Sequence, residues 1–318
     1  MAKIVILDSY HINPGDLRWD PFNNLGDLDI HEFTEDSEVV DRCKNAEIVL
    51  SNKVLLKEKH IQKLPDLKCI CVMATGYNNI DIEACKARNI IVCNIPAYST
   101  DSVAQYVFAG ILEVTNKLSE YHKEIRAGRW QEINDWSYSR ETMFDIAGKT
   151  LGVLGFGKIG QRVAEIGLAF GMKVISYHKH PKRDKMEGVE FVDLEYLFAN
   201  SDYLSLHVPL NPSSHHIVNK STLELMKSDA ILINTGRGPL INEADLAEYL
   251  KSYKIKGAIL DVLSNEPPEK DNPLTGLDNC YITPHIAWAN IEARQRLMNI
   301  LLENVKAYLI GSAQNRII

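Results

Sequence analysis

The sequence lacks the features that mark several special classes of protein. None of its apolar runs is long enough to cross a bilayer, and its first residues lead into a predicted strand without the charged start and cleavage site of a signal peptide. The net charge of −7 provides no basic surplus for nucleic acid or for a membrane surface. Its six cysteines form no C-x-x-C pair. We therefore expect a cytoplasmic protein with reduced thiols, no bound metal and no nucleic-acid or membrane partner.

Low-complexity segments and internal repeats are also absent, so the 318 residues predict about two ordinary globular domains. The first 99 residues alternate short apolar runs with helical stretches such as 37–44 and 80–88. We expect strands at 3–8, 29–33, 47–50, 68–73 and 90–94. This alternation is typical of a doubly wound parallel sheet. No glycine-rich phosphate turn occurs in this part, so it predicts an α/β domain with a task other than phosphate binding.

A glycine-rich turn occurs later, where Gly155, Gly157 and Gly160 form the pattern G-x-G-x-x-G. A predicted strand precedes the turn, a helical pattern follows it, and a second strand follows at 172–177. That context is the one in which the pattern binds a dinucleotide. The first two glycines permit the tight turn and the approach of the pyrophosphate, and the third permits close packing of helix and strand. We predict NAD(H) or NADP(H) as the cofactor.

The segment between these two regions predicts a linker. A proline and a cluster of capping residues at 96–102 lead into a predicted helix over 102–127, which Gly128 ends. A long loop over 128–144 follows and carries Trp130 and Trp136. The last helix, over 290–309, is long enough to pack on the first domain. We expect a discontinuous substrate-binding domain of residues 1–99 and 290–318, and a Rossmann domain of residues 100–289 that includes the linking helix.

Ligands of open parallel sheets lie beyond the carboxyl ends of the strands, and three candidate catalytic residues follow predicted strands there. Arg237 lies between two glycines, where its planar fork suits a carboxylate or a carbonyl oxygen. Glu266 and His285 follow two further strands. A glutamate that is hydrogen-bonded to a histidine orients the ring and favours its protonated form, which suits proton transfer. Beside a nicotinamide, this set fits the reduction of a 2-oxo acid.

Several motifs in a fixed order resemble those of the D-isomer-specific 2-hydroxyacid dehydrogenases over nearly the whole chain. The matching pieces are 74–81, 102–105, 148–161, 207–210, 233–238, 260–262 with 266–267, and 283–286. The resemblance implies a Rossmann cofactor domain inserted into a flavodoxin-like substrate domain, both doubly wound and parallel. Motifs at 102–105, at 285–288 and in the aromatic loop are most similar to the glycerate dehydrogenase (hydroxypyruvate reductase) branch.

The resemblance also implies roles for individual residues. Arg237, Glu266 and His285 would be catalytic, and the first and last of these would also contact the substrate. Backbone N–H groups near Thr75 and Gly76 would bind its carboxylate, and Tyr98 and Trp288 are candidates for the pocket wall. Candidate cofactor contacts, besides the three glycines, are Val103, Lys158, Ile159, His178, Lys179, His207, Pro209, Thr235, Gly236 and Asp261.

One position departs from the NAD-specific pattern. An acidic residue usually ends the second strand, about 20 residues after the first glycine, and binds the ribose 2′-hydroxyl. Here that place is taken by His178, followed by Lys179, His180, Lys182 and Arg183. Because this place holds no carboxylate, a 2′-phosphate would meet no negative side chain there. The basic residues would attract it. The alternatives are NAD and NADP, with the family's usual NAD slightly favoured.

We predict NAD(P)H-dependent reduction of hydroxypyruvate to D-glycerate, with D-lactate-type reduction and 3-phosphoglycerate oxidation as the alternatives among enzymes. A non-catalytic NAD(H)-sensing protein of the corepressor kind shares the scaffold and remains an alternative. By analogy with the family, the helix and aromatic loop over 102–144 predict a homodimer. The partner molecule expected on chemical grounds is a small 2-oxo or 2-hydroxy acid.

Overall fold

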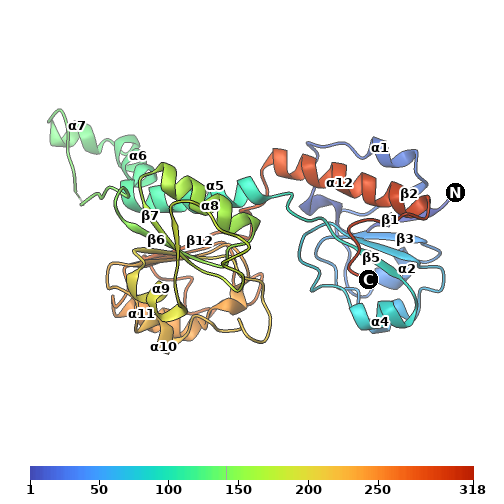
Figure 1. Cartoon of the computed structure of the whole chain (residues 1–318). Helices are drawn as coiled ribbons and strands as arrows, with labels where there is room; N and C mark the ends of the chain where they lie inside the picture. Colours follow the sequence, from blue (N-terminus) through green and yellow to red (C-terminus); the bar gives the residue numbers. More distant parts are fainter. Residues whose placement is uncertain (141) are drawn as a thin grey trace. The chain divides into compact units, whose positions relative to one another are not determined.

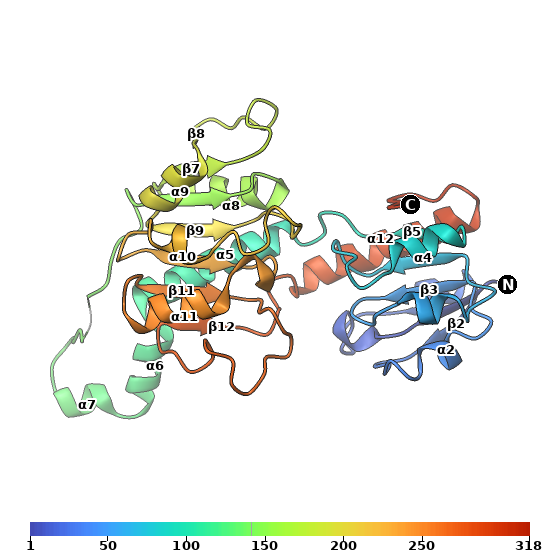
Figure 2. The ribbon, with the colours of Figure 1, turned by 90° about the horizontal axis from the view of Figure 1, so that it is seen from below.

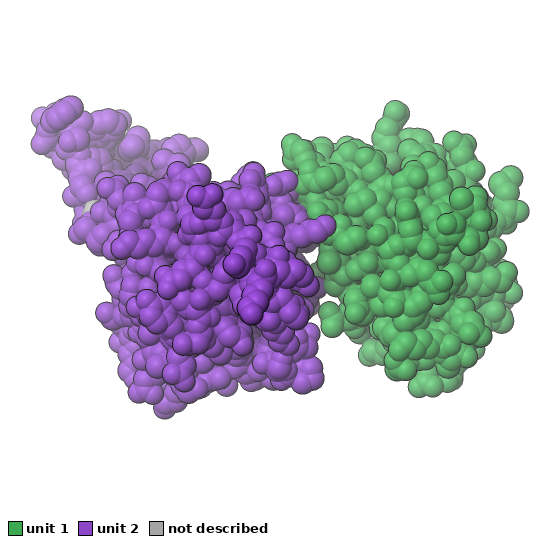
Figure 3. Space-filling model, viewed as in Figure 1, with its two compact units in different colours: residues 1–99, 289–318 green, residues 100–288 purple. Residues whose placement is uncertain are grey.

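Two parallel β-sheets form the framework of the chain (Figures 1 and 2). The structure is a computed structural model that describes residues 1–140 and 142–318. The chain divides into two compact units, coloured separately in Figure 3. Unit 1 contains Met1–Ser99 and Ala289–Ile318, and unit 2 contains Thr100–Trp288. The predicted fold class, two doubly wound parallel α/β units, is confirmed.

Unit 1 contains a five-stranded sheet in the order β2-β1-β3-β4-β5, the order of flavodoxin-like folds. Its strands are β1 (Lys3–Ile6), β2 (Asp27–Ile30), β3 (Ile48–Ser51), β4 (Cys69–Val72) and β5 (Ile91–Cys93). Its helices are α1 (Asp20–Asn23), α2 (Val39–Arg42), α3 (Glu58–Ile61), α4 (Ile82–Ala87) and α12 (Ile291–Leu309), with a 3-10 turn, η1, at Ser9–His11. The central strands are buried on both faces, so all their residues except Ser51 are apolar.

Unit 2 contains a seven-stranded parallel sheet in the order β12-β11-β10-β9-β6-β7-β8. With β6 as the first strand, this is the 3-2-1-4-5-6 order of Rossmann folds with one strand added at the end. The strands are β6 (Thr150–Leu154), β7 (Lys173–Tyr177), β8 (Val189–Phe191), β9 (Tyr203–Leu206), β10 (Ile231–Asn234), β11 (Gly257–Leu260) and β12 (Cys280–Ile282).

Helices cover both faces of this second sheet (Figures 1 and 2). One face packs on α5 (Thr100–Asn116) and α8 (Lys158–Ala169), through Val107, Ile111 and Val163. The other face packs on α9 (Leu194–Asn200), α10 (Lys220–Leu223) and α11 (Glu243–Lys251). A 3-10 turn, η2, lies at Gly238–Leu240. The strand ends of this sheet carry most of the predicted site residues.

Two predictions about the linking segment are wrong. The helix expected over 102–127 is broken, because Lys117 adopts a left-handed conformation (φ 55°) between α5 and α6 (Leu118–Arg126). The expected loop over 128–144 contains a short helix, α7 (Arg129–Ile133), after Gly128. Position 141 of that predicted loop lies outside the described residues. Neither α6 nor α7 has a buried residue, and both extend away from the body of unit 2 (Figures 1 and 2).

Other differences from the predicted elements are small. Strand β8 at the sheet edge was not predicted, because its middle residue is an exposed glutamate and its three residues form no apolar run. Strand β2 begins two residues before the predicted start, and several helices are shorter at both ends. None of the helices in the described part of the chain combines the length and apolar character that a membrane span requires.

Within unit 1, one arginine ties α12 to the loop that follows β1. The Arg294 guanidinium donates to both carboxylate oxygens of Asp16, at 2.6 and 2.5 Å, and to the carbonyl oxygen of Ile12 at 3.2 Å. Its Nε donates to the carbonyl oxygen of Ala289. The bidentate geometry makes this a strong charge-assisted contact between segments almost 280 residues apart.

We predict that Arg294→Ala lowers the free energy of unfolding of unit 1 by about 2 kcal/mol, because it leaves several acceptors without their donor. Arg18→Ala is the matched control: the Arg18 side chain is 89% exposed and pairs with the exposed Asp20. That variant should change stability by less than about 0.5 kcal/mol. Urea unfolding of both variants measures the difference, and equal losses would contradict the structural role of Arg294.

Candidate functional site

The glycine turn after β6 is shaped by close backbone contacts. Gly155 has a φ of +96°, and a Cβ there would lie 2.8 Å from the backbone of His207. A Cβ on Gly160 would lie 2.1 Å from the carbonyl oxygen of Gly155. The Gly155 N–H donates to the carbonyl oxygen of Tyr177 at the end of β7. The turn therefore needs glycine at 155 and 160 to pass between β9 and the start of α8.

The second glycine of the turn borders open space. A Cβ on Gly157 would meet no atom within 4 Å, and Gly157 caps α8 without a side-chain hydrogen bond. The first N–H groups of a helix, here those of Lys158, Ile159 and Gly160, have no acceptor within the helix, and the helix dipole favours an anion beside them. This arrangement fits the pyrophosphate of a dinucleotide.

The sequence predicted no carboxylate at the end of β7, but the structure places one there. His178 accepts a hydrogen bond from the Phe156 N–H through Nδ1, at 3.2 Å. Its Nε2 lies 2.7 Å from a carboxylate oxygen of Asp184, six residues further on. Lys179 is exposed, and its cofactor contact remains a prediction. The loop thus brings a carboxylate to the strand end where the sequence places none.

The end of β9 carries a neutral histidine. His207 Nε2 lies 2.9 Å from the Ser205 hydroxyl, and burial lowers the pKa of His207 to about 4. The following Pro209 is exposed, and its carbonyl oxygen accepts from the Ser214 hydroxyl at 2.6 Å. Another candidate cofactor contact, Val103, is buried in α5. An uncharged ring at 207 suits a surface that packs against an uncharged part of a ligand.

The turn after β10 positions Arg237 through a buried asparagine. The Asn234 amide donates to the carbonyl oxygen of Arg237 at 2.9 Å, and its oxygen accepts from the Gly236 N–H at 3.0 Å. The Thr235 hydroxyl oxygen is buried without a partner among the described residues. An unsatisfied polar atom at this predicted cofactor contact is consistent with a ligand group that pairs with it.

The same turn packs closely on the segment that follows β11. A Cβ on Gly238 would lie 2.0 Å from the backbone of Leu263, so only glycine fits there. The Leu263 N–H donates to Glu266 Oε1 at 3.2 Å. Because β10, β11 and β12 are neighbours in the sheet, Arg237, Glu266 and His285 follow three adjacent parallel strands. The structure therefore brings the three predicted catalytic residues to one edge of unit 2.

Glu266 and His285 form a direct pair. His285 Nδ1 lies 2.6 Å from Glu266 Oε2, and both side chains are partly exposed. His285 has a left-handed φ of +57°, and its carbonyl oxygen accepts from the Trp288 indole N–H at 2.9 Å. This hydrogen bond holds the Trp288 side chain beside His285.

Asp261 organises the segment that carries His285. Its carboxylate accepts from the Thr283 hydroxyl and from the N–H groups of Ile286 and Ala287, all at 2.8 Å, and its carbonyl oxygen accepts from the His285 N–H. Burial raises the pKa of Asp261, although the bonds from Ala287 and Ile286 oppose that rise. The resemblance implied a cofactor contact for Asp261 and missed this internal role.

The predicted substrate contacts Thr75, Gly76 and Tyr98 belong to unit 1. The Thr75 hydroxyl donates to the carbonyl oxygen of Ile95, and the Asn94 amide donates to the Thr75 carbonyl oxygen, both at 2.7 Å. These bonds fix the loop after β4 against the end of β5. Tyr98 is buried, and its carbonyl oxygen accepts from Arg296 on α12. The substrate roles of all three residues remain predictions.

Sequence reasoning missed Asn234, Gly238 and Asp184 as residues that shape the site. A signal existed for Asn234, because an asparagine two positions before a glycine turn commonly bonds the backbone beyond it. Nothing in the sequence pairs Asp184 with His178, since only the fold of the loop decides that contact. Among the described residues, no group of three or more histidine, cysteine or acidic side chains is arranged to hold a metal ion.

The His207 environment predicts a pH dependence of stability. Its native pKa of about 4 lies below the ordinary 6.5, so between these values the unfolded chain binds more protons than the native one. The stabilising contribution is complete above about pH 6.5 and is lost as the pH falls toward 4. The free energy of unfolding should fall from pH 7 to pH 4.5 in both proteins. We expect this fall to be roughly 1–3 kcal/mol smaller in His207→Gln than in the unmodified chain. Urea unfolding at both pH values tests this, and parallel losses would contradict it.

Comparison with known proteins identifies the family. Residues 108–287 match the family model for the D-isomer specific 2-hydroxyacid dehydrogenase, NAD binding domain. The chain is 41% identical over 318 residues to a hydroxypyruvate reductase of Blautia hydrogenotrophica, covering 98% of each chain. It is 39% identical to a glycerate dehydrogenase of Methylorubrum extorquens, covering 90% of this chain and 91% of the relative.

Solved structures agree with these relatives. An acyclic imino acid reductase in complex with NADPH and D-Arg superposes with a TM-score of 0.87 at 36% identity, covering 99% of this chain and 100% of that one. The match in sequence extends over both units, and the match in fold includes both sheets. This chain belongs to the D-isomer-specific 2-hydroxyacid dehydrogenases and is an NAD(P)-dependent oxidoreductase.

Proposed function

We propose that this chain reduces hydroxypyruvate to D-glycerate with NADH or NADPH. The observation that carries the proposal is the 2.6 Å pair of Glu266 and His285, together with Arg237, at the ends of three adjacent strands. The relatives at 41% and 39% identity are a hydroxypyruvate reductase and a glycerate dehydrogenase, which supports this substrate over other 2-oxo acids.

The chemistry divides between the cofactor and the chain. A bound nicotinamide supplies the hydride that the reduction requires. His285 donates the proton to the carbonyl oxygen of the substrate through Nε2, because its Nδ1 faces Glu266. Glu266 orients the ring and stabilises its protonated form, while Asp261 holds the backbone on which the ring is carried. In the reverse direction the same ring accepts the proton from the hydroxyl.

Arg237 holds and polarises the substrate. Its Nη1 donates to the carbonyl oxygen of Gly236, which sets the direction of the side chain, and the guanidinium has five donors in all. A planar fork of this kind grips a carboxylate or carbonyl oxygen in a fixed orientation. We further propose that backbone N–H groups at Thr75 and Gly76 bind the substrate carboxylate, with Tyr98 and Trp288 in the pocket wall.

The cofactor assignment within the proposal follows the sheet of unit 2. The glycine turn and the first turn of α8, with Lys158 and Ile159, would hold the pyrophosphate. Val103, His207, Pro209, Thr235, Gly236 and Asp261 would line the remainder of the dinucleotide. The choice between NADH and NADPH depends on the end of β7.

We also propose that the chain forms a homodimer through the arm of residues 117–140, which contains α6 and α7. Trp136 is 87% exposed, and Leu118 and Trp130 are also exposed on this arm. Several exposed large apolar side chains on an extension with no buried residue mark an interaction surface. A second copy of this chain is the partner that the family analogy favours.

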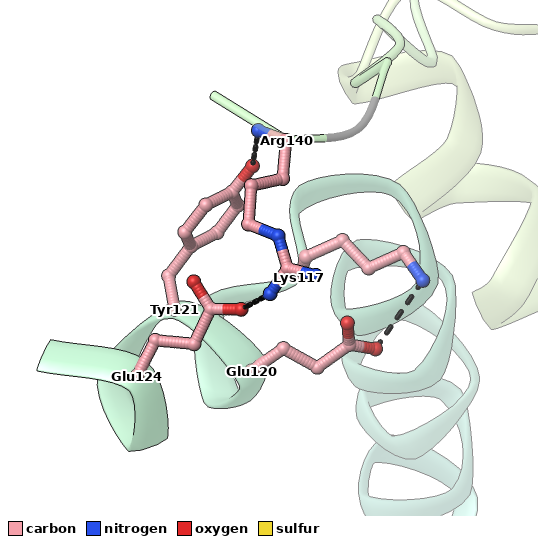
Figure 4. Close-up of a pocket in the computed structure, with 5 residues that line it drawn as sticks. All are labelled: Lys117, Glu120, Tyr121, Glu124 and Arg140. Atoms are coloured by element: carbon pink, nitrogen blue, oxygen red, sulfur yellow. Dashed lines mark hydrogen bonds and ion pairs between the residues drawn. The ribbon is translucent and has the colours of Figure 1, made fainter. Parts of the chain in front are cut away.

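The arm has a defined shape because polar contacts connect α6 with the returning segment of residues 138–140 (Figure 4). The Tyr138 hydroxyl and the Arg140 guanidinium both bond to the Glu124 carboxylate, and the Arg140 N–H donates to the Tyr121 hydroxyl. Lys117 pairs with Glu120 at 3.2 Å. The side chains that line this small pocket thus bond to one another, which fits a structural role for the pocket.

The proposed function predicts rapid turnover of hydroxypyruvate when nicotinamide absorbance is followed, with slower turnover of glyoxylate and pyruvate. Arg237→Ala should lower kcat/KM by about 10²–10³-fold, because it removes the donor that holds and polarises the substrate. Its affinity for NADH, measured by calorimetry, should stay within about threefold. Arg162→Ala, which removes an exposed arginine of α8, is the matched control and should leave turnover unchanged. No turnover of hydroxypyruvate by the unmodified chain would refute the substrate assignment.

For the arm, light scattering should give twice the 35.9 kDa chain mass. Trp136→Ser together with Leu118→Ser should weaken this dimer at least about tenfold by removing apolar area from its centre. Tyr253→Ser, a change at another exposed aromatic residue of unit 2, should leave the dimer intact. A monomeric unmodified chain would exclude the homodimer, and an unaffected double variant would place the interface elsewhere.

A further inference from the structure

The loop after β7 turns back so that its seventh residue, Asp184, returns to the strand end. The N–H groups of Arg183 and Asp184 donate to the carbonyl oxygen of His180, at 3.1 and 3.3 Å. This turn brings Asp184 Oδ2 to 2.7 Å from His178 Nε2. The two side chains are only 16% and 13% exposed. A carboxylate therefore lies at the end of the second strand, although it comes from position 184.

His178 connects that carboxylate to the glycine turn. Its Nδ1 faces the N–H of Phe156, which lies between the first two glycines of the motif and can only donate. Nδ1 must then be the acceptor nitrogen, which places the proton of the neutral ring on Nε2, directed at Asp184. A second proton on Nδ1 would break the bond to Phe156. His178 thus links the glycine turn to the loop through its two ring nitrogens.

The place of Asp184 is the one where this fold reads the ribose. β6 and β7 pair in parallel, and the Gly155 N–H bonds to the Tyr177 carbonyl oxygen, so the end of β7 adjoins the glycine turn and the start of α8. A carboxylate there accepts the 2′-hydroxyl of NAD, whereas an arginine accommodates the 2′-phosphate of NADP. The hydrogen bond from Arg183 lowers the pKa of Asp184 to about 2, so the carboxylate is ionised at neutral pH.

Arg183 supplies the opposite charge at the same place. Its Nη2 lies 2.6 Å from Asp184 Oδ2, and its Nε lies 2.9 Å from Oδ1. The Arg183 side chain is 67% exposed, unlike that of its partner. Because the guanidinium is mostly exposed to solvent, it can exchange the carboxylate for a stronger acceptor without the loss of a buried contact. A phosphate dianion is such an acceptor.

We infer that Asp184, held in place by His178, is the residue that reads the ribose of the dinucleotide in this chain. In the complex with NADH its carboxylate accepts the 2′-hydroxyl. In the complex with NADPH, Arg183 leaves Asp184 and binds the 2′-phosphate. The two residues therefore set the ratio of the affinities for NADH and NADPH. This inference rests on the proposed function only in that the chain must bind both dinucleotides.

Calorimetric titration of the unmodified chain and its variants with NADH and NADPH, in the absence of substrate, tests the inference. Asp184→Asn should weaken NADH at least about tenfold relative to NADPH, because it removes a charged acceptor. Arg183→Ala should weaken NADPH by a similar factor relative to NADH. Asp184→Ser is a second variant in case the first does not fold, with circular dichroism as the check. A ratio that stays unchanged in the folded Asp184 variants would overturn the inference.

Matched controls separate direct contact from the charge of the loop. Glu187→Gln and Lys185→Ala change the net charge by the same amounts at exposed positions of the same loop. Glu187→Gln is the control for Asp184→Asn, and Lys185→Ala is the control for Arg183→Ala. If either control shifts the ratio of the NADH and NADPH affinities as much as its matched variant does, the net charge of the loop sets the preference and Asp184 does not read the ribose. Nitrogen NMR of His178 should show the proton on Nε2 in the unmodified chain, and a proton on Nδ1 would also overturn the arrangement.

The two proposals fail in different ways. Tight binding of dinucleotides without turnover of hydroxypyruvate would refute the substrate assignment, while the affinity ratios would still test Asp184. If hydroxypyruvate is turned over but the affinity ratios do not change in the Asp184 variants, only the inference about Asp184 is refuted and the proposed function stands.

Discussion

The parallel direction of every strand is the constraint on which the site of unit 2 depends. In a parallel sheet all carboxyl ends lie at one edge, so residues far apart in sequence meet there. Gly155 follows β6, Arg237 follows β10, Glu266 follows β11 and His285 follows β12. Because β10, β11 and β12 are neighbours, the three catalytic candidates lie at adjacent strand ends although they are far apart in the sequence.

Buried polar groups make this edge rigid. Asn234 and Asp261 end or follow adjacent strands, and each uses its side chain to bond the backbone of the turn that carries a candidate catalytic residue. A buried carboxylate or amide is costly unless its hydrogen bonds are made, so these residues specify one conformation of their turns. The left-handed backbone of His285 is maintained by this framework, since Asp261 bonds the residues on both sides of it.

The segments for which we propose cofactor and partner specificity lie outside this framework. The loop from His178 to Asp184 is held by one histidine contact and one exposed ion pair, and the arm of residues 117–140 is held by a small set of polar bonds at its base. Loops on a rigid sheet can vary in this way without cost to the core. The candidate catalytic residues thus lie on the rigid strand ends, whereas the residues proposed to select the cofactor and the partner lie on loops.

The sequence by itself determined the fold class, the glycine turn and the candidates Arg237, Glu266 and His285. Short apolar runs, glycine spacing and strand-end position are local properties, and each is visible in a short stretch of residues. The tertiary structure decided what depends on contacts between distant or folded-back segments. It broke the predicted helix at Lys117, gave Asp261 the role of holding the His285 segment, and returned Asp184 to His178. Those contacts follow from loop geometry and burial, which no local pattern encodes.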